Sequence, residues 1–496
     1  MVRFFKKHRN VVQYLLIAVV TFLYFSFFIN KGITFYDEGY IVESSYLTYL
    51  GKLPYKDFYF QYTPLTVWIG AFLFKVFGTG ILSLRWFALF VSLMVVMIGH
   101  EIARRLTNMN VALLVAFGLA VWGFPHANFL WPSSLSLLFL FIGIFFFLNY
   151  QQTGKARFLA MAGASVALNV LSKQNLGAMN LLTSFIFILL ISRRFLTRSL
   201  MYFCASLFLI LVLSFLLIFL NNPELIGLGE SISRSLALAR GQAFFSAYPF
   251  FGGFPTSLGE GIKWAVKSYL YVSPIIIIFL LGLRLHWKGD MKPINIGVFI
   301  MAALHFLTVV WPTADLAHFS FGVPTILIVF LIGLLSRSLL IRRFAYFSII
   351  IFIFIGLYKT FFMSYYTFET PYLKLRDVIY IKEEKIVVDQ KYKVIVETLN
   401  KEKNGLFRNK KIFVYSYAPM IYFILEKDPP VYDLYTVENL LSDTSISKTI
   451  NSLEQSRVDV ILLESWRESN SEITRYIRKN FKKTGEIWDF EVLERI

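Results

Sequence analysis

The sequence predicts an α-helical polytopic membrane protein with a small α/β region at its C-terminal end. The chain has 496 residues, of which 57% are hydrophobic and only 16% charged, whereas soluble domains are about 45–50% apolar and about 25% charged. Many apolar runs also reach the roughly 20 residues that a helix needs to cross a bilayer. From about residue 364 the composition becomes an ordinary polar mixture, which is typical of a soluble region.

The apolar runs predict about eleven spanning helices. Segment 64–78, "PLTVWIGAFLFKVFG", is shorter, opens with Pro64 and carries Lys75. We therefore expect it to lie along the outer membrane surface as a juxtamembrane helix. The eleven expected spans are 11–30, 82–103, 110–130, 132–150, 157–172, 177–192, 199–220, 268–285, 294–312, 319–337 and 342–363.

The loop charges set the expected orientation, because basic residues mark cytoplasmic loops. Every second loop is basic, and Glu101 and Asp290 are the acids among these segments. This pattern predicts a cytoplasmic N-terminus, an extracytoplasmic C-terminus and a first outer loop at 31–81. Counting 64–78 as a span would place the basic loops outside. The basic residues are Arg3, Lys6, Lys7, Arg9, Arg104, Arg105, Lys155, Arg157, Arg193, Arg194, Arg198, Arg284, Lys288, Lys292, Arg337, Arg342 and Arg343.

Composition and motifs exclude several classes of protein. The single Cys204 lies in an apolar run, so no intrachain disulfide or cysteine metal site is expected. The loop pattern accounts for the net charge of +18 without nucleic acid as a partner. No G-x-x-x-x-G-K-[ST] loop occurs, which argues against a nucleotide-driven pump. We expect no cofactor and no obligatory metal. The first apolar run is too long for a cleaved signal and is interpreted as an uncleaved anchor.

The tail predicts a small extracytoplasmic α/β domain at 364–496, which follows the membrane domain at 1–363. Alternation of strand and helix patterns is the basis for this prediction. The expected strands are 411–417, 458–464 and 485–496, and the expected helices are 390–403, 417–427, 437–456 and 468–483.

Candidate functional residues gather on the face predicted to be outward. Asp37 and Glu38 stand side by side just after the first span, and on local sequence they could equally cap a helix that begins near Gly39. Taken alone, Lys173 has the properties of an interfacial lysine that extends toward water. The outer-loop tyrosines are partly an aromatic belt. Single histidines at the membrane surface, such as His126 and His318, are more often structural than catalytic.

Together these residues fit the transfer of a sugar from a lipid-linked phosphate. The leaving phosphate needs cations or hydrogen-bond donors and no general acid. The acceptor hydroxyl needs a base, and a carboxylate serves in an inverting displacement.

The stretch at 35–90 resembles the first outer loop of GT-C-fold glycosyltransferases. The similar groups are the bacterial relatives of protein O-mannosyltransferases, the aminoarabinose transferases and the Rgt-like lipopolysaccharide glycosyltransferases. Four features carry the likeness. They are an acidic pair, an aromatic-Pro-Leu segment, a Phe-Gly pair and an arginine that enters span two, here Asp37-Glu38, Tyr62 to Leu65, Phe77-Gly78 and Arg85. "LSKQNLG" (171–177), "WPTADLAHFSFGVP" (311–324) and "YAPMIYFILEKDPPVYD" (417–433) are similar to later motifs of these proteins.

The resemblance implies a GT-C-like fold and transfer from a polyprenyl-phosphate sugar to a glycan, lipid or protein acceptor of the bacterial envelope, at the plasma membrane. It implies that Asp37 is the base and that Glu38 supports it or positions the acceptor. The implied substrate-binding residues are Tyr40, Tyr62, His126, Lys173, Gln174, Asp315 and His318. Of these, Lys173 would hold the donor phosphate.

Two features depart from the relatives. The turn "WGFPHANFLWP" offers His126 where several relatives have a second acid, and "YTPL" replaces a Lys- or His-Pro-Pro segment. An oligosaccharide ligase or oligosaccharyltransferase with a diphosphate-linked donor is the alternative enzyme. A transporter or membrane scaffold is the non-catalytic alternative. A transporter would be expected to have two related halves with broken helices, and neither is evident.

Overall fold

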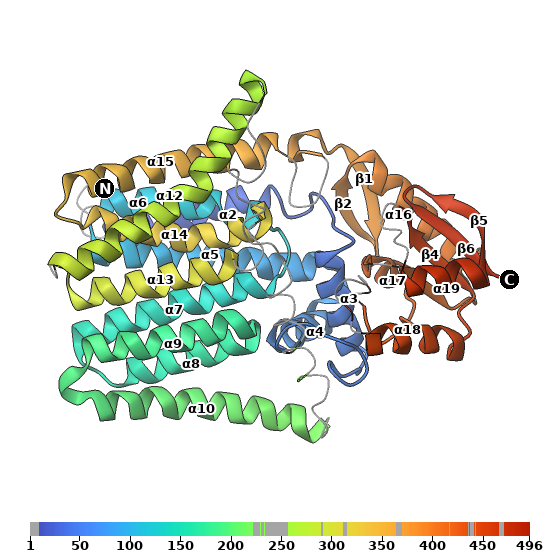
Figure 1. The fold of residues 1–496 in the computed structure, drawn as a ribbon, viewed down its shortest axis with the longest axis horizontal. Helices are drawn as coiled ribbons and strands as arrows, with labels where there is room; N and C mark the ends of the chain where they lie inside the picture. Colours follow the sequence, from blue (N-terminus) through green and yellow to red (C-terminus); the bar gives the residue numbers. More distant parts are fainter. Residues whose placement is uncertain are drawn as a thin grey trace.

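A bundle of long helices occupies one end of the protein, and a mixed α/β domain occupies the other (Figure 1). Two short helices lie between these parts. The computed structural model describes residues 9–221, 256–288, 291–310, 315–363, 370–415 and 417–496, the last range with gaps at 435, 437–440, 442 and 466–470. The predicted outer loop 221–267 falls mostly outside the described residues.

Eleven long or apolar helices form the bundle within the described ranges. Nine of them are long and apolar enough to cross a membrane, and the two shorter apolar helices of the bundle are Val11–Ser26 and Arg157–Ser172. Each predicted span coincides with one bundle helix. The helices are α2 (Arg9–Ser26), α5 (Ile81–Leu106), α6 (Met109–Val121), α7 (Pro132–Thr153), α8 (Arg157–Ser172), α9 (Gln174–Ile191), α10 (Leu196–Asn221), α12 (Leu258–Lys288), α13 (Pro293–Val310), α14 (Leu316–Leu334) and α15 (Leu339–Phe362).

The two short helices lie across the end of the bundle, between it and the α/β domain (Figure 1). They are α3 (Asp37–Tyr49) and α4 (Leu65–Phe77). Helix α4 has 13 residues, which extend about 20 Å and fall short of a hydrocarbon core about 30 Å thick. Phe72 and Phe77 of α4 are exposed. An exposed apolar face of this kind suits contact with the membrane surface, as the sequence predicts for 64–78.

A buried ion pair joins the end of the first span to the start of the second. Arg85 of α5 donates from Nε to Glu38 Oε1 at 2.6 Å and from Nη2 to Glu38 Oε2 at 2.8 Å. Its Nη2 also donates to the carbonyl of Gly32 at 2.8 Å, and Nη1 to that of Ile29 at 3.2 Å. Both side chains are almost completely buried. The pair therefore fixes where the chain leaves α2 and where α3 begins.

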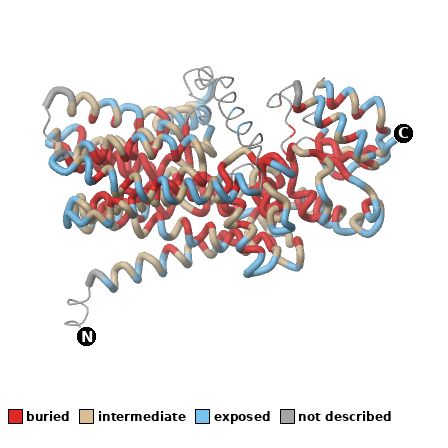
Figure 2. The backbone as a smooth tube through the Cα atoms, turned by 90° about the horizontal axis from the view of Figure 1, so that it is seen from below, coloured by how far each residue is buried: buried red, intermediate tan, exposed pale blue. Residues whose placement is uncertain are grey.

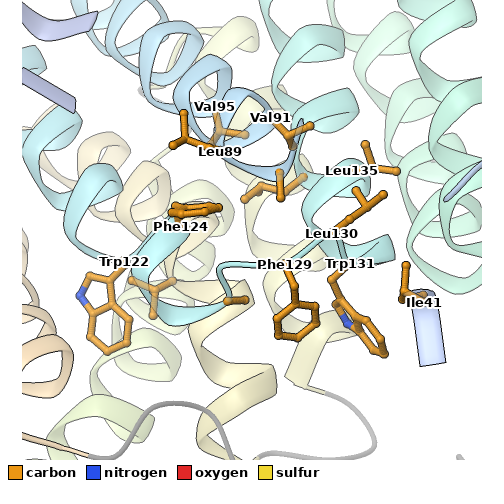
Figure 3. Packing of buried hydrophobic residues seen from close by; sticks show 14 of the residues in the cluster. Ile41, Leu89, Val91, Val95, Trp122, Phe124, Phe129, Leu130, Trp131 and Leu135 are labelled. Atoms are coloured by element: carbon orange, nitrogen blue, oxygen red, sulfur yellow. The ribbon is translucent and has the colours of Figure 1, made fainter. Parts of the chain in front are cut away.

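The turn at 122–131 packs into the hydrophobic core beneath α5. Figure 3 shows Trp122 and Phe124 on one side of this turn and Trp131 beside Ile41 of α3. Asn128 donates to the carbonyls of Phe28 and Lys31, both at 2.7 Å. Buried residues continue from the bundle into the α/β domain in Figure 2. One hydrophobic cluster thus extends across both predicted domains, and a second cluster lies within the C-terminal domain.

A β-hairpin that the sequence analysis did not predict docks the tail onto the bundle. Strands β1 (Asp377–Ile381) and β2 (Glu384–Val388) pair antiparallel. The turn residues Lys382 and Glu383 both have positive φ. Turns with this conformation usually contain Asn-Gly or another glycine pair, which the sequence lacks here. Glu384 accepts from the amide of Leu82 at 2.9 Å and so caps the start of α5. Val387 exchanges backbone hydrogen bonds with Asn30 and Gly32.

The remaining strands form a four-stranded sheet in the order β3-β4-β6-β5. Strands β3 and β4 are parallel, and the other two pairs are antiparallel. The strands are β3 (Ile412–Tyr415), β4 (Val460–Glu464), β5 (Phe481–Ile487) and β6 (Phe490–Arg495), and the helices of the tail are α16 (Gln390–Lys403), α17 (Met420–Leu425), α18 (Asp443–Gln455) and α19 (Glu472–Asn480).

The C-terminal hairpin corrects two predicted elements. The strand predicted at 485–496 is two strands, because the chain reverses at Trp488, whose φ is 52°. The helix predicted at 468–483 ends at Asn480. Phe481 follows and turns its side chain into the core of the sheet. Neither Trp488 nor Asp489 is a turn signal that the sequence pattern would reveal.

Removing either partner of the buried ion pair should unfold the outer part of the protein. Arg85→Ala or Glu38→Ala leaves an uncompensated buried charge, which should reduce the free energy of unfolding by about 3–5 kcal/mol. Lys52→Ala is the matched control, since the Lys52–Asp428 pair is largely exposed and should contribute less than about 1 kcal/mol. Thermal unfolding of the purified protein in detergent measures both. Equal melting temperatures for Glu38→Ala and Lys52→Ala would contradict this role.

Candidate active site

Asp37 is the first residue of α3, and its carboxylate is half-buried at the boundary between the bundle and the outer domain. The hydroxyl of Tyr417 donates to Asp37 Oδ1 at 2.8 Å. A carboxylate in the first turn of a helix is also favoured by the helix dipole. The Tyr417 hydroxyl therefore orients the Asp37 carboxylate at the start of α3.

Glu38 is held differently from its neighbour. It is 1% exposed, and both of its carboxylate oxygens accept hydrogen bonds from Arg85. Glu38 Oε2 also accepts from the amide of Thr34 at 3.2 Å. Glu38 therefore fixes the start of α3, and in this way it also fixes the position of Asp37.

Lys173 lies in the turn between α8 and α9, beneath the outer loop. Its Nζ donates to Ser133 Oγ at 2.8 Å, at the start of α7, and stands 5.4 Å from the ring centroid of Tyr62. Burial lowers the pKa of Lys173 to about 8, and the negative charge of Asp37 acts against this shift. Asp37 and Lys173 thus lie within electrostatic reach of each other, although 136 positions separate them in the sequence.

Gln174 fastens the outer loop to the same turn. Its Nε2 donates to the carbonyl of Gln61 at 2.9 Å, and its Oε1 accepts from the amide of Thr63 at 3.2 Å. Thr63 Oγ1 donates to the carbonyl of Val170 at 2.6 Å. These contacts place Tyr62 beside both Lys173 and Trp131. The centroids of the Tyr62 and Trp131 rings are 5.4 Å apart.

Tyr40 is buried below this surface and supports it. Its ring stacks on Phe60 at 5.5 Å, and its hydroxyl accepts from the amide of Gln61 at 2.8 Å. Burial raises the pKa of Tyr40 well above its usual range. Tyr40 is 1% exposed, so it shapes the 59–61 segment from beneath.

His126 belongs to a separate buried cluster. Its Nδ1 lies 2.8 Å from Lys359 Nζ, and its ring stacks on Trp122. Lys359 also donates to Ser320 Oγ at 3.2 Å. His126, Ser134 and Ser320 line a cavity of about 30 Å³, which is roughly the volume of one water molecule.

Asp315 and His318 form a helix cap at the start of α14. Asp315 Oδ1 accepts from the amide of His318, and Oδ2 lies 2.8 Å from His318 Nδ1. Burial acts to raise the pKa of Asp315, but hydrogen bonds and charge from His318 bring it below its usual value. The Asp-x-x-His spacing therefore matches a helix N-cap, in which Asp315 accepts from the amide of the residue three positions later, His318. Residues 311–314 of this motif lie outside the described residues.

The α/β domain contributes Tyr417 and Glu464 to this region, two residues that the sequence pattern does not mark as site residues. Tyr417 follows β3, stacks on Tyr36 and bonds Asp37. The hydroxyl of Tyr36 donates to Glu464 Oε1 at 2.7 Å, at the end of β4. The "YAPM" sequence at 417–420 follows a strand and could have marked Tyr417 as a functional residue. It does not reveal which residue Tyr417 contacts.

The contacts bring Lys173, Tyr62 and Gln174 together at the end of the bundle that faces the α/β domain, and Asp37 lies within electrostatic reach of Lys173. Such a site offers a carboxylate that can accept a proton and a cation that can stabilise a developing negative charge. Across the described part of the chain, no group of three or more His, Cys, Asp or Glu side chains is arranged to hold a metal ion.

Residues 61–218 match the family described as dolichyl-phosphate-mannose-protein mannosyltransferase. No curated protein sequence matches the chain at a significant level. The fold, however, is shared with solved structures over nearly the whole length.

ArnT from Cupriavidus metallidurans bound to undecaprenyl phosphate has 14% identity and a TM-score of 0.62, over 99% of this chain and 98% of that one. Its apo form has 14% identity and a TM-score of 0.60, with the same coverage. An Archaeoglobus fulgidus oligosaccharyltransferase in complex with Zn and sulfate has 12% identity and a TM-score of 0.53, over 96% of this chain and 73% of that one.

The family match covers α4 to α10, and the structural likeness extends the same fold to the remainder. Residues 61–218 therefore resemble this family of membrane glycosyltransferases, and the chain as a whole shares the fold of ArnT.

Proposed function

We propose that the protein transfers a sugar from a polyprenyl-phosphate donor to a glycan, lipid or protein acceptor of the bacterial envelope. The observation that carries this proposal is that Asp37 and Lys173 lie within electrostatic reach of each other at one end of the bundle. The ArnT structure of the same fold holds undecaprenyl phosphate, which supports a donor of this class. The basic loops at the opposite end of the bundle support a reaction on the extracytoplasmic face of the plasma membrane.

The proposed step is a single displacement that inverts the anomeric carbon. The acceptor hydroxyl attacks that carbon and gives its proton to Asp37. The bond between the anomeric carbon and the phosphate oxygen breaks, and the phosphate leaves with the electron pair. Lys173 binds this phosphate and stabilises the charge that it gains. Glu38, through Arg85, and Tyr417 position the base.

Tyr62 and Gln174 are proposed to form the wall of the donor site beside Lys173. Tyr40 and His126, which are buried, are proposed to support it from within. Asp315 and His318 are proposed to border the acceptor side, since they are partly exposed at the outer start of α14.

Asp37→Asn should reduce transfer by about 10²- to 10⁴-fold, because the amide cannot accept the proton of the acceptor hydroxyl. The amide oxygen still accepts from Tyr417, so the melting temperature should stay unchanged. Transfer from a radiolabelled polyprenyl-phosphate sugar to envelope acceptors measures the effect. Asp57→Asn on the same outer loop is the matched control. Full activity of Asp37→Asn would rule out this residue as the base.

Lys173→Met should raise the KM for the lipid donor about 10- to 100-fold, since a hydrogen bond to a charged group contributes about 1.5–3 kcal/mol. In the unaltered enzyme, donor affinity should fall as pH rises through about 8, where Lys173 loses its proton. Lys173→Met should lose this pH dependence. Lys75→Met on the exposed face of α4 is the control. An unchanged donor KM in Lys173→Met would remove Lys173 from the donor site.

Tyr417→Phe should lower kcat about 10- to 100-fold and leave the KM for the lipid donor unchanged. The lost hydroxyl orients the Asp37 carboxylate, and a hydrogen bond to a charged group contributes about 1.5–3 kcal/mol. Tyr380→Phe, at an exposed position on β1, is the control. An unchanged kcat would mean that Tyr417 does not position Asp37.

A further inference from the structure

Several buried polar side chains lack a hydrogen-bond partner in the described structure, and three of them lie on two bundle helices that pack against each other. They are Asn180 and Ser184 of α9 and His305 of α13. Asn180 and His305 are each 2% exposed, and Ser184 is completely buried. The amide and the imidazole are unpartnered at both of their polar atoms.

Asn180 and Ser184 lie on one face of α9, below Lys173. Asn180 and Ser184 follow Lys173 by 7 and 11 positions. Such spacing returns to the same side of a helix with 3.6 residues per turn. Phe187 continues this face, and its ring stacks on Phe147 of α7 at 4.6 Å.

His305 reaches the same depth from the neighbouring helix. Helices α9 and α13 pack against each other and run antiparallel, with Gly297 of α13 against the Phe187 ring. His305 is 8 residues, or about 12 Å, outward of Gly297, and Asn180 is 7 residues, or about 10 Å, outward of Phe187. The His305 ring is also within electrostatic reach of Lys173. We call Asn180, Ser184 and His305 the α9–α13 seam, which has Lys173 at its outer end and the Phe147–Phe187 stack as its floor.

Unpartnered polar groups at this position are expensive to keep. Each costs about 1–3 kcal/mol when buried without a hydrogen bond, and lipid supplies no alternative partner. Apolar residues of the same size would stabilise the bundle more. Polar side chains inside a membrane domain usually serve a function. We therefore expect the seam to form its hydrogen bonds with a bound molecule.

The chemistry of the seam selects a neutral, hydroxylated partner. An amide, a hydroxyl and an imidazole together offer donors and acceptors, and each sugar hydroxyl both donates and accepts. A phosphate, which only accepts, would face the acceptor atoms of Asn180 and His305 and would be better bound at Lys173. A sugar phosphate presents both chemistries in one molecule, with the phosphate at the anomeric carbon and hydroxyls on the opposite side of the ring.

We propose that the α9–α13 seam binds the hydroxyls of the donor sugar that lie far from its anomeric carbon, and so determines which sugar the enzyme transfers. This rests on the proposed function, in which Lys173 holds the donor phosphate. The anomeric carbon then stays near Lys173 and Asp37, while the far edge of the ring extends inward to Asn180 and His305.

Binding measurements on the purified full-length protein test this directly. The probes are undecaprenyl phosphate and its glucose, mannose, galactose and arabinose conjugates. The unaltered protein should bind at least one conjugate about tenfold more tightly than the bare carrier, as one or two additional hydrogen bonds would give. Asn180→Leu and His305→Phe should reduce this preference below about threefold and leave the affinity for the bare carrier unchanged.

The melting temperature separates a binding role from a structural one. Asn180→Leu and His305→Phe should keep or raise it, because each removes an unpartnered buried group. His100→Phe is the matched control, since His100 of α5 is equally buried and unpartnered but lies toward the opposite end of the bundle. It should leave the sugar preference intact.

Two outcomes would overturn the inference alone. One is an unaltered protein that binds the bare carrier as tightly as every conjugate, and the other is a sugar preference that survives both substitutions. A protein that binds neither the bare carrier nor any conjugate would overturn the lipid-phosphate donor itself.

Discussion

The Arg85–Glu38 pair is the constraint on which the outer half of the structure depends. One guanidinium binds both oxygens of a carboxylate and also the carbonyls of Ile29 and Gly32. It thereby ties the end of α2, the first turn of α3 and the start of α5 to a single point. Because the pair is buried and its polar atoms are bonded, these three segments have little freedom to move relative to one another. Asp37 precedes Glu38 directly, so the position of the proposed base is fixed by the pair.

The outer domain reinforces the same point from the opposite side. Glu384 caps α5 one turn before Arg85, and Tyr417 reaches Asp37 from the chain that follows β3. Gly39 allows this approach, because a Cβ there would come within 2.5 Å of the Met420 amide. Tyr36 and Glu464 add a further bond between α3 and β4. The site is consequently shared between the bundle and the tail, and a displacement of the tail would displace Asp37.

The bilayer makes the order of the helices predictable from the sequence, but it does not make the long-range contacts between side chains predictable. Span length and loop charge are imposed by hydrocarbon thickness and by orientation, so the order of helices and the short α4 follow from the sequence alone. The partner of Arg85 does not, since it lies 47 residues away. Tyr417 is 380 residues from Asp37, and the Lys382-Glu383 turn lacks the glycine that marks most two-residue hairpins. The short Asp-x-x-His spacing, by contrast, corresponds to a local contact, because Asp315 caps α14 and lies 2.8 Å from His318 Nδ1.

The separation of charge at the site has a chemical consequence. Within the described residues, Lys173 makes its hydrogen bond to Ser133, and Asp37 accepts from Tyr417. Each charge is thus oriented by a neutral hydroxyl, and the two remain within electrostatic reach of each other. The Ser133 hydroxyl is a neutral partner of Lys173 that a phosphate can readily replace. This arrangement is consistent with the proposed roles of Lys173 as the phosphate-binding cation and of Asp37 as the base.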